Sequence, residues 1–117
     1  MNILVLAAHP DDEVLGMGGT IKKFIKKGFN VKIVIFATGI SARRSSNYKN
    51  TENYDVDDNT ILKMNKQIEK LKIDAISASK VLGVSDIEFL DFPDNEMDLI
   101  SNLEITKSIE KIIKKFK

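Results

Sequence analysis

The residues best suited to chemistry stand near the start of the chain, in the run His9-Pro10-Asp11-Asp12-Glu13. One tight turn can bring the imidazole of His9 and the carboxylate of Asp12 to a common point. Pro10 helps to set that turn, because its ring fixes φ near −65°. Nitrogen and oxygen ligands of this kind suit Zn²⁺, which usually takes three protein ligands in a catalytic site and leaves one position for water. The run therefore predicts a metal site.

Asp11 is predicted to have a different role from its neighbour. Adjacent side chains diverge, so Asp11 is left free to act as a base toward a water molecule at the site. Simpler interpretations exist: His9 could be a hydrogen-bonded structural residue, and Asp11 or Asp12 could cap the following helix. Taken singly, these residues favour the simpler interpretations, but their occurrence as one block after a buried strand favours the site.

The composition limits the classes of protein and of site. A chain of 117 residues fits one domain, and its net charge of +1 gives no electrostatic reason to expect nucleic acid as a partner. There is no cysteine, so any metal must be held by oxygen atoms and by His9, the single histidine. The apolar run 3–8 is too short for a signal peptide or a membrane span, which makes the cytoplasm the expected location.

The hydrophobic pattern predicts alternating strands and helices. Residues 3–8 and 31–36 resemble buried strands, and residues 87–90 a short third strand. A first helix is expected to start at the glycines Gly16, Gly18 and Gly19 and to end at Gly28. A second helix should occupy residues 61–82, and a capping box of Ser101 and Glu104 should open a last helix that ends near Phe116. Residues 38–56 show no periodicity and are expected to form a long loop.

This order predicts an α/β fold, a Rossmann-like three-layer αβα arrangement with a parallel sheet. Strands 2 and 3 should lie on one side of strand 1, so that strand 1 is an edge within residues 1–117. That edge has no charge, bulge or proline to protect it. We therefore expect residues 1–117 to be a single domain that is truncated after the third helix and lacks a fourth strand. The three polar segments 9–13, 38–57 and 91–98 should meet at the carboxyl ends of the strands.

Longer runs of the sequence resemble one family. The run AAHPDDEVLGMGGT at residues 7–20 closely resembles the signature of the PIG-L/LmbE-like zinc-dependent N-deacetylases. Residues 37–43 (ATGISAR) resemble the family's loop after the second strand. Residues 81–84 (VLGV) and 89–95 (FLDFPDN) resemble the region of its third strand. The resemblance spans essentially the whole chain, as the N-terminal part of such a domain.

The resemblance implies a zinc-dependent hydrolase that removes the acetyl group from an N-acetylglucosamine-type amino sugar or glycoconjugate. It implies that His9 and Asp12 are zinc ligands, that Asp11 is the general base, and that Arg43 and Asp94 lie near the substrate. The family's third zinc ligand is a histidine from a segment beyond a fourth strand, and residues 1–117 hold no second histidine. The expected partner is a small-molecule amino sugar, and the sequence also allows a homo-oligomer.

Two other functions remain open from the sequence. A truncated, non-catalytic α/β fragment would lack the third ligand and would bind metal weakly or only scaffold a partner. A mononucleotide-binding module would use Gly16, Gly18 and Gly19 as a phosphate cradle, although Ile21 stands where a dinucleotide fingerprint has its last glycine.

Overall fold

The computed structural model of the chain describes residues 1–38, 58–94 and 97–117. The elements follow the order β1 (Asn2–Ala7), α1 (Asp12–Lys26), β2 (Asn30–Ala37), α2 (Asp58–Leu82), β3 (Asp86–Phe92), the short 3-10 helix η3 (Met97–Leu99) and α3 (Asn102–Phe116). Arg43 and most of the predicted loop 38–56 lie outside the described residues. No helix in the described ranges is long and apolar enough to cross a membrane.

The three strands form one parallel sheet in the order β1-β2-β3. The central strand β2 is buried along almost its whole length, which agrees with its continuous apolar sequence. Ile33, Val34 and Ile35 are fully buried and carry the core of the sheet. Within the described part of the chain, β1 is therefore an edge strand, as predicted.

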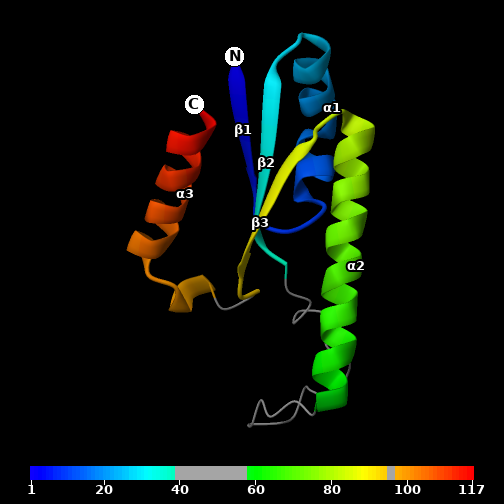
Figure 1. Cartoon of the computed structure of the whole chain (residues 1–117), viewed down its shortest axis with the longest axis vertical. Helices are drawn as coiled ribbons and strands as arrows, with labels where there is room; N and C mark the ends of the chain where they lie inside the picture. The colour runs from blue at the N-terminus through cyan, green and yellow to red at the C-terminus, as the bar shows by residue number, and fades with distance from the viewer. Residues whose placement is uncertain (39–57, 95–96) are drawn as a thin grey trace.

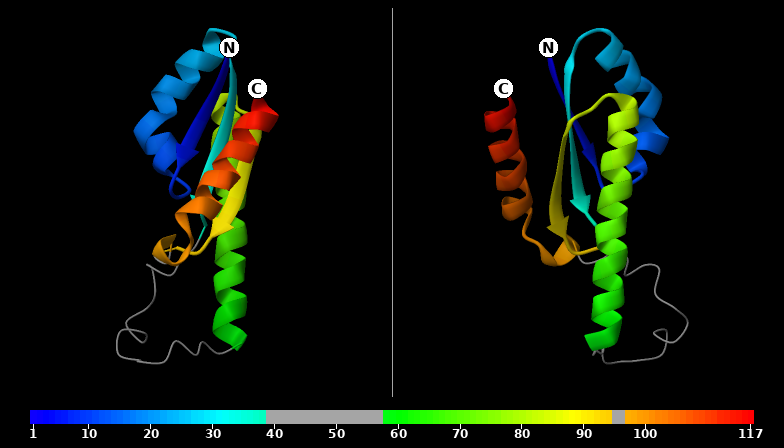
Figure 2. Two further views of the ribbon diagram at one scale, coloured as in Figure 1. Left: turned by 90° about the vertical axis from the view of Figure 1, so that its left-hand side faces the viewer. Right: turned by 45° about the vertical axis from the view of Figure 1, so that its right-hand side comes forward.

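The helices cover both faces of the sheet (Figure 1). Figure 2 shows α1 and α2 on one face and α3 alone on the other, which confirms the three-layer arrangement. The core lies between the sheet and the pair α1 and α2, where Ile21 and Ala75 pack against the strands. Helix α3 is joined to the start of the sheet where the Asn2 side-chain amide donates to the Phe116 carbonyl (2.8 Å).

Helix α1 begins earlier than predicted, at Asp12, so the prediction that the glycines start this helix is wrong. All three glycines lie inside α1. A Cβ atom at Gly16 or Gly19 would meet nothing within 4 Å, and only Gly18 packs closely, against Val14 and Leu82. The first helical turn is instead fixed by backbone bonds from Val14 and Leu15 to the Asp11 carbonyl. Because the glycines are helical, they form no phosphate-cradling loop ahead of the helix.

The other elements match their predicted ranges to within a few residues. Helix α2 runs past the end of the sheet (Figure 1), so its first turns leave Ile61 44% and Leu62 58% exposed. Ser101 caps α3 by accepting from the Glu104 backbone N–H (3.1 Å), the first half of the predicted capping box. Strand β3 is longer than predicted and includes Asp91 and Phe92.

The free edge of β1 generates a prediction about association. Leu6 is 45% exposed on a strand that has no charge or proline. We expect the 117-residue polypeptide to self-associate by pairing of this edge, and Leu6→Lys to lower the associated fraction because a charge disfavours edge pairing. Sedimentation velocity measures the association, and Leu103→Lys on the exposed side of α3 is the control. A stable monomer whose Ile3–Leu6 amides are strongly protected from hydrogen exchange would contradict the prediction.

Candidate functional site

The site lies at the carboxyl end of β1, in the turn that joins it to α1. The Ala37 backbone N–H donates to the Ala8 carbonyl (2.9 Å), which continues the sheet up to the turn. The Asp12 N–H then donates to the His9 carbonyl (3.3 Å), and the His9 N–H donates to Asp12 Oδ2 (2.9 Å). These reciprocal bonds hold the two side chains on one side of the turn, with His9 Nδ1 3.6 Å from Asp12 Oδ2.

The other nitrogen of the same imidazole contacts the segment after β3. His9 Nε2 lies 2.8 Å from Asp94 Oδ1, a contact between residues 85 positions apart in the sequence. The side chain of Asp94 is only 6% exposed, whereas those of His9 and Asp12 are each about half exposed. The imidazole therefore lies between a buried carboxylate and an accessible one.

His9 and Asp12 fit a shared zinc ion. Two ligand atoms bound to one tetrahedral zinc at the usual distances are about 3.3–3.6 Å apart, and Nδ1 and Oδ2 are separated by 3.6 Å. One imidazole nitrogen and one carboxylate oxygen are also a donor set that zinc accepts. Within residues 1–38, 58–94 and 97–117 no group of three His, Cys, Asp or Glu side chains could hold a metal. His9 and Asp12 thus have the separation that a shared ion would require, and their role as ligands stays a prediction.

Asp11, the predicted base, has an unusual backbone conformation. Its φ of 118° lies in the region that favours glycine, and its exposed side chain makes no capping hydrogen bond to α1. The Asp11 backbone N–H donates to Glu13 Oε2 (3.0 Å), and Glu13 itself is 2% exposed. Among the described residues, Glu13 Oε1 has no hydrogen-bond partner. Glu13 therefore fixes the conformation of Asp11, and such strain is typical of functional turns.

A second polar cluster lies beside the site and joins three elements. The Thr38 hydroxyl, just after β2, donates to Asp91 Oδ1 (2.7 Å), and Lys72 of α2 reaches the same oxygen (2.8 Å). Burial acts to raise the pKa of Asp91, but the hydrogen bonds from Lys72 and Thr38 and the lysine charge outweigh it. The pKa of Asp91 is consequently below its ordinary value. This cluster fixes the end of β3 from which Asp94 follows.

The structure brings together three of the predicted site residues: His9, Asp12 and Asp94. Asp11 is adjacent to them in the turn, and Arg43 is outside the described residues. Sequence reasoning missed Lys72, because one lysine on the polar side of a long amphipathic helix gives no signal of a distant carboxylate. Its position one helical turn from Ile68 and Ala75 was the only available indication that it lies next to the packed face.

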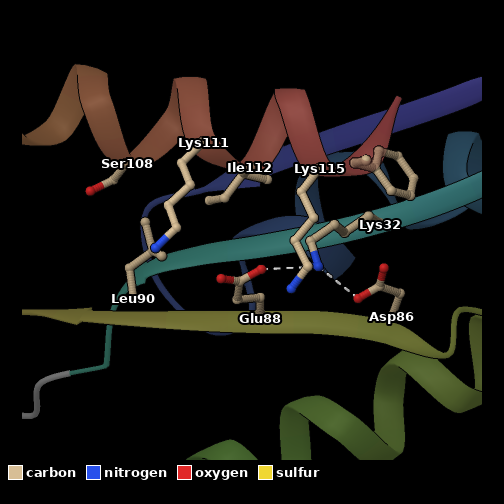
Figure 3. A pocket seen from close by; sticks show the side chains of 9 residues that line it. Lys32, Asp86, Glu88, Leu90, Ser108, Lys111, Ile112 and Lys115 are labelled. Atoms are coloured by element: carbon tan, nitrogen blue, oxygen red, sulfur yellow. Dashed lines mark hydrogen bonds and ion pairs between the residues drawn. The ribbon is translucent and has the colours of Figure 1, made fainter.

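A pocket of about 350 Å³ lies apart from this turn, between α3 and the sheet (Figure 3). Lys32 forms ion pairs there with Asp86 (2.7 Å) and Glu88 (3.0 Å). Burial acts to lower the pKa of Lys32, but the two carboxylates outweigh that effect and raise it. The pocket's central charges are satisfied by one another, so we assign these ion pairs to the packing of the sheet.

The Asp91 cluster predicts a pH dependence of stability. Because the pKa of Asp91 is lowered by folding, its contribution is present above the ordinary value of 3.8 and is lost as the pH falls below it. We expect Asp91→Asn to flatten the dependence of the unfolding midpoint on pH in this acidic range. The effect should be small, since the carboxylate is half exposed. Urea unfolding at several pH values measures it, with Asp98→Asn on η3 as the control. An unchanged slope in the Asp91 variant would refute the assignment.

The Glu13 contact predicts a difference between two substitutions. Glu13→Ala removes the acceptor for the Asp11 N–H together with a buried side chain, and should lower the free energy of unfolding by about 1–3 kcal/mol. Glu13→Gln keeps a side-chain oxygen in the same place, so it should cost less. Urea denaturation of both variants provides the comparison. If Glu13→Ala were as stable as the unchanged protein, Glu13 would not be fixing this turn.

One known protein family and two individual relatives resemble this sequence. The sequence matches the family PIG-L, described as GlcNAc-PI de-N-acetylase, over residues 4–117. Diacetylchitobiose deacetylase of Thermococcus kodakarensis is 29% identical over 113 residues, which are 97% of this chain and 36% of the relative. The 1D-myo-inositol 2-acetamido-2-deoxy-alpha-D-glucopyranoside deacetylase of Gordonia bronchialis is 40% identical over 37 residues, 32% of this chain and 13% of the relative. The chain thus spans little more than a third of the longer match.

Solved structures give the same result for the fold. The N,N'-diacetylchitobiose deacetylase from Pyrococcus horikoshii, complexed with an inhibitor, matches with a TM-score of 0.71 at 27% identity. That match covers 97% of this chain and 37% of the other. The 4-carboxy-2-hydroxymuconate hydratase GalB from Pseudomonas putida also reaches a TM-score of 0.71, over 98% of this chain and 43% of its own, but at 20% identity. It supports the fold alone. Because the family match extends over nearly the whole sequence, from residue 4 to residue 117, this chain belongs to the PIG-L family.

Proposed function

We propose that this chain carries the metal-binding and proton-transfer residues of an N-deacetylase site that acts on an N-acetylglucosamine-type amino sugar. The observation that carries the proposal is the convergence of His9 Nδ1 and Asp12 Oδ2, 3.6 Å apart, next to the strained Asp11. The names of two relatives support the substrate class, since both are deacetylases of acetamido sugars. In this proposal, residues 1–117 form the N-terminal part of the deacetylase domain.

The metal in this proposal is zinc, with His9 and Asp12 as its ligands. When bound, it would supply Lewis-acid polarisation of the acetyl carbonyl and of the attacking water. A neutral imidazole and one carboxylate leave part of the double positive charge uncompensated, which suits that function. Both side chains are about half exposed, so an ion and a substrate can reach them.

Asp11 is the proposed general base. Its carboxylate accepts a proton from the attacking water as the new C–O bond forms at the acetyl carbon. The same proton is then available for the amine as the C–N bond breaks, so the products are acetate and a free amino sugar. The bond from the Asp11 N–H to Glu13 prepares this residue for the reaction, because it fixes the backbone before the substrate arrives.

Arg43 remains a predicted contact of the sugar; the sequence predicts the same role for Asp94, whose side chain bonds His9 in the structure. Both come from segments that follow strands at the same edge as His9, which is where ligands bind in open α/β sheets. A cytoplasmic location and a homo-oligomer also stay predictions.

A second candidate function is a non-catalytic α/β unit. It is favoured by one observation: among the described residues, no group of three His, Cys, Asp or Glu side chains could hold a metal. The two candidates differ in whether the protein releases acetate from diacetylchitobiose in the presence of zinc. Acetate release that His9→Ala abolishes supports the enzyme, and its absence supports the non-catalytic unit.

The roles of the two adjacent aspartates can be separated by substitution. Asp11→Asn keeps the shape of the side chain but cannot take a proton, so turnover should fall by about 10²–10⁴-fold while bound zinc is retained. Asp12→Ala should lose zinc and activity together. Turnover is measured by acetate release and zinc by elemental analysis after dialysis, with Asp98→Asn as the matched control. Normal turnover in a zinc-loaded Asp11→Asn protein would show that Asp11 is not the base.

A further inference from the structure

The contact between His9 and Asp94 joins the two segments that flank the site. Asp94 Oδ1 is 2.8 Å from His9 Nε2, and its side chain is almost completely buried. A hydrogen bond to a carboxylate that is shielded from water is stronger and more directional than one at the surface. Asp94 therefore restrains the orientation of the imidazole.

The position of Asp94 is itself fixed by the end of β3. The register between β2 and β3 shifts between Ile35 and Ala37, where two steps along β2 match three steps along β3. Asp91 lies in this irregular stretch with a φ of 56°, and Thr38 and Lys72 hold its carboxylate. An extra residue reverses the alternation of side chains and bends the strand. The segment that carries Asp94 therefore begins at a strand end that these contacts hold in place.

The chemistry of imidazole gives this contact a consequence at the other nitrogen. An ionised carboxylate can only accept hydrogen bonds, so Nε2 must carry the hydrogen that Asp94 receives. In a neutral imidazole, Nδ1 is then the nitrogen with the free lone pair. Nδ1 is also the nitrogen that faces Asp12 Oδ2, at 3.6 Å. The tautomer that Asp94 selects is the one that places a metal-binding lone pair beside the second predicted ligand.

We propose that Asp94 is a positioning residue: it fixes the tautomer and the ring orientation of His9 so that Nδ1 is the atom that binds the metal. This inference deepens the proposed function and rests on it. It differs from the role that the sequence predicted for Asp94, which was contact with the substrate. A carboxylate behind a metal-binding histidine orients the ring and makes it a better ligand.

The first readout is the imidazole itself, and the 117-residue chain is well suited to it because His9 is its single histidine. A long-range ¹H–¹⁵N NMR spectrum at alkaline pH should show the hydrogen on Nε2 and none on Nδ1. The Nε2–H proton should be directly visible, because the bond to Asp94 slows its exchange with water. Asp94→Ala should abolish that proton signal, whereas Asp98→Asn, which changes an exposed carboxylate on η3, should keep it.

The second readout is zinc affinity, measured without substrate by competition with a chelating indicator. Asp94→Ala should weaken zinc binding by about 10–100-fold, the usual effect of removing a residue that orients a ligand. Asp94→Asn should weaken it less, because its amide oxygen can still accept from Nε2–H. Asp98→Asn should bind like the unchanged chain, and circular dichroism of each variant reports whether the fold is intact.

The outcomes separate this inference from the proposed function. If His9→Ala loses zinc while folded Asp94→Ala retains the affinity and the Nε2–H signal of the unchanged chain, the positioning role is wrong and the metal site stands. If Asp94→Ala changes only the KM for the amino sugar, Asp94 is a substrate contact and the inference also fails. If His9→Ala binds zinc normally, both the inference and the proposed function are overturned.

Discussion

The three strands pair in parallel, so their carboxyl ends lie along one edge of the sheet, and the site depends on this arrangement. Parallel pairing makes the segments after β1, β2 and β3 neighbours in space although the helices between them separate them in sequence. Thr38 after β2 contacts the end of β3, and Asp94 after β3 contacts His9 after β1. The apolar core around β2 supports this edge, because Ile33 and Ile35 are fully buried in it and protein interiors are closely packed.

Two non-glycine residues with positive φ lie at that edge of the sheet. Asp11 is in the turn after β1, and Asp91 is at the end of β3. Such a conformation costs of order 1–3 kcal/mol and persists only where the surroundings compensate for it. At Asp11 the compensation comes from Glu13, a buried carboxylate that accepts the backbone N–H. At Asp91 it comes from Thr38 and Lys72, which bind one carboxylate oxygen from two different elements. The polar network thus offsets the local strain that the turn and the register shift impose.

The sequence was sufficient for the fold class, the strand order and the pairing of His9 with Asp12, because these follow from hydrophobic periodicity and from a local turn. It failed in two places. The start of α1 at Asp12 conflicts with the low helix propensity of Gly16, Gly18 and Gly19, and the first turn is held instead by backbone bonds to the Asp11 carbonyl. The contact between His9 and Asp94 joins residues 85 positions apart. It also depends on a register shift in β3, which no pattern of residues in the sequence predicts.

The two carboxylates beside His9, those of Asp12 and Asp94, differ in exposure, and this difference allows them different roles. Asp12 is half exposed, so its oxygen can exchange a water molecule or a hydrogen bond for an arriving cation at little cost. Asp94 is almost completely buried, so breaking its bond to the imidazole would weaken the pairing of a shielded charge, which is more costly than the same change at the surface. The buried carboxylate therefore keeps the ring in place while the exposed one stays available. The same imidazole can then bond the buried Asp94 carboxylate through Nε2 and bind a ligand from solvent through Nδ1, without a change in its orientation.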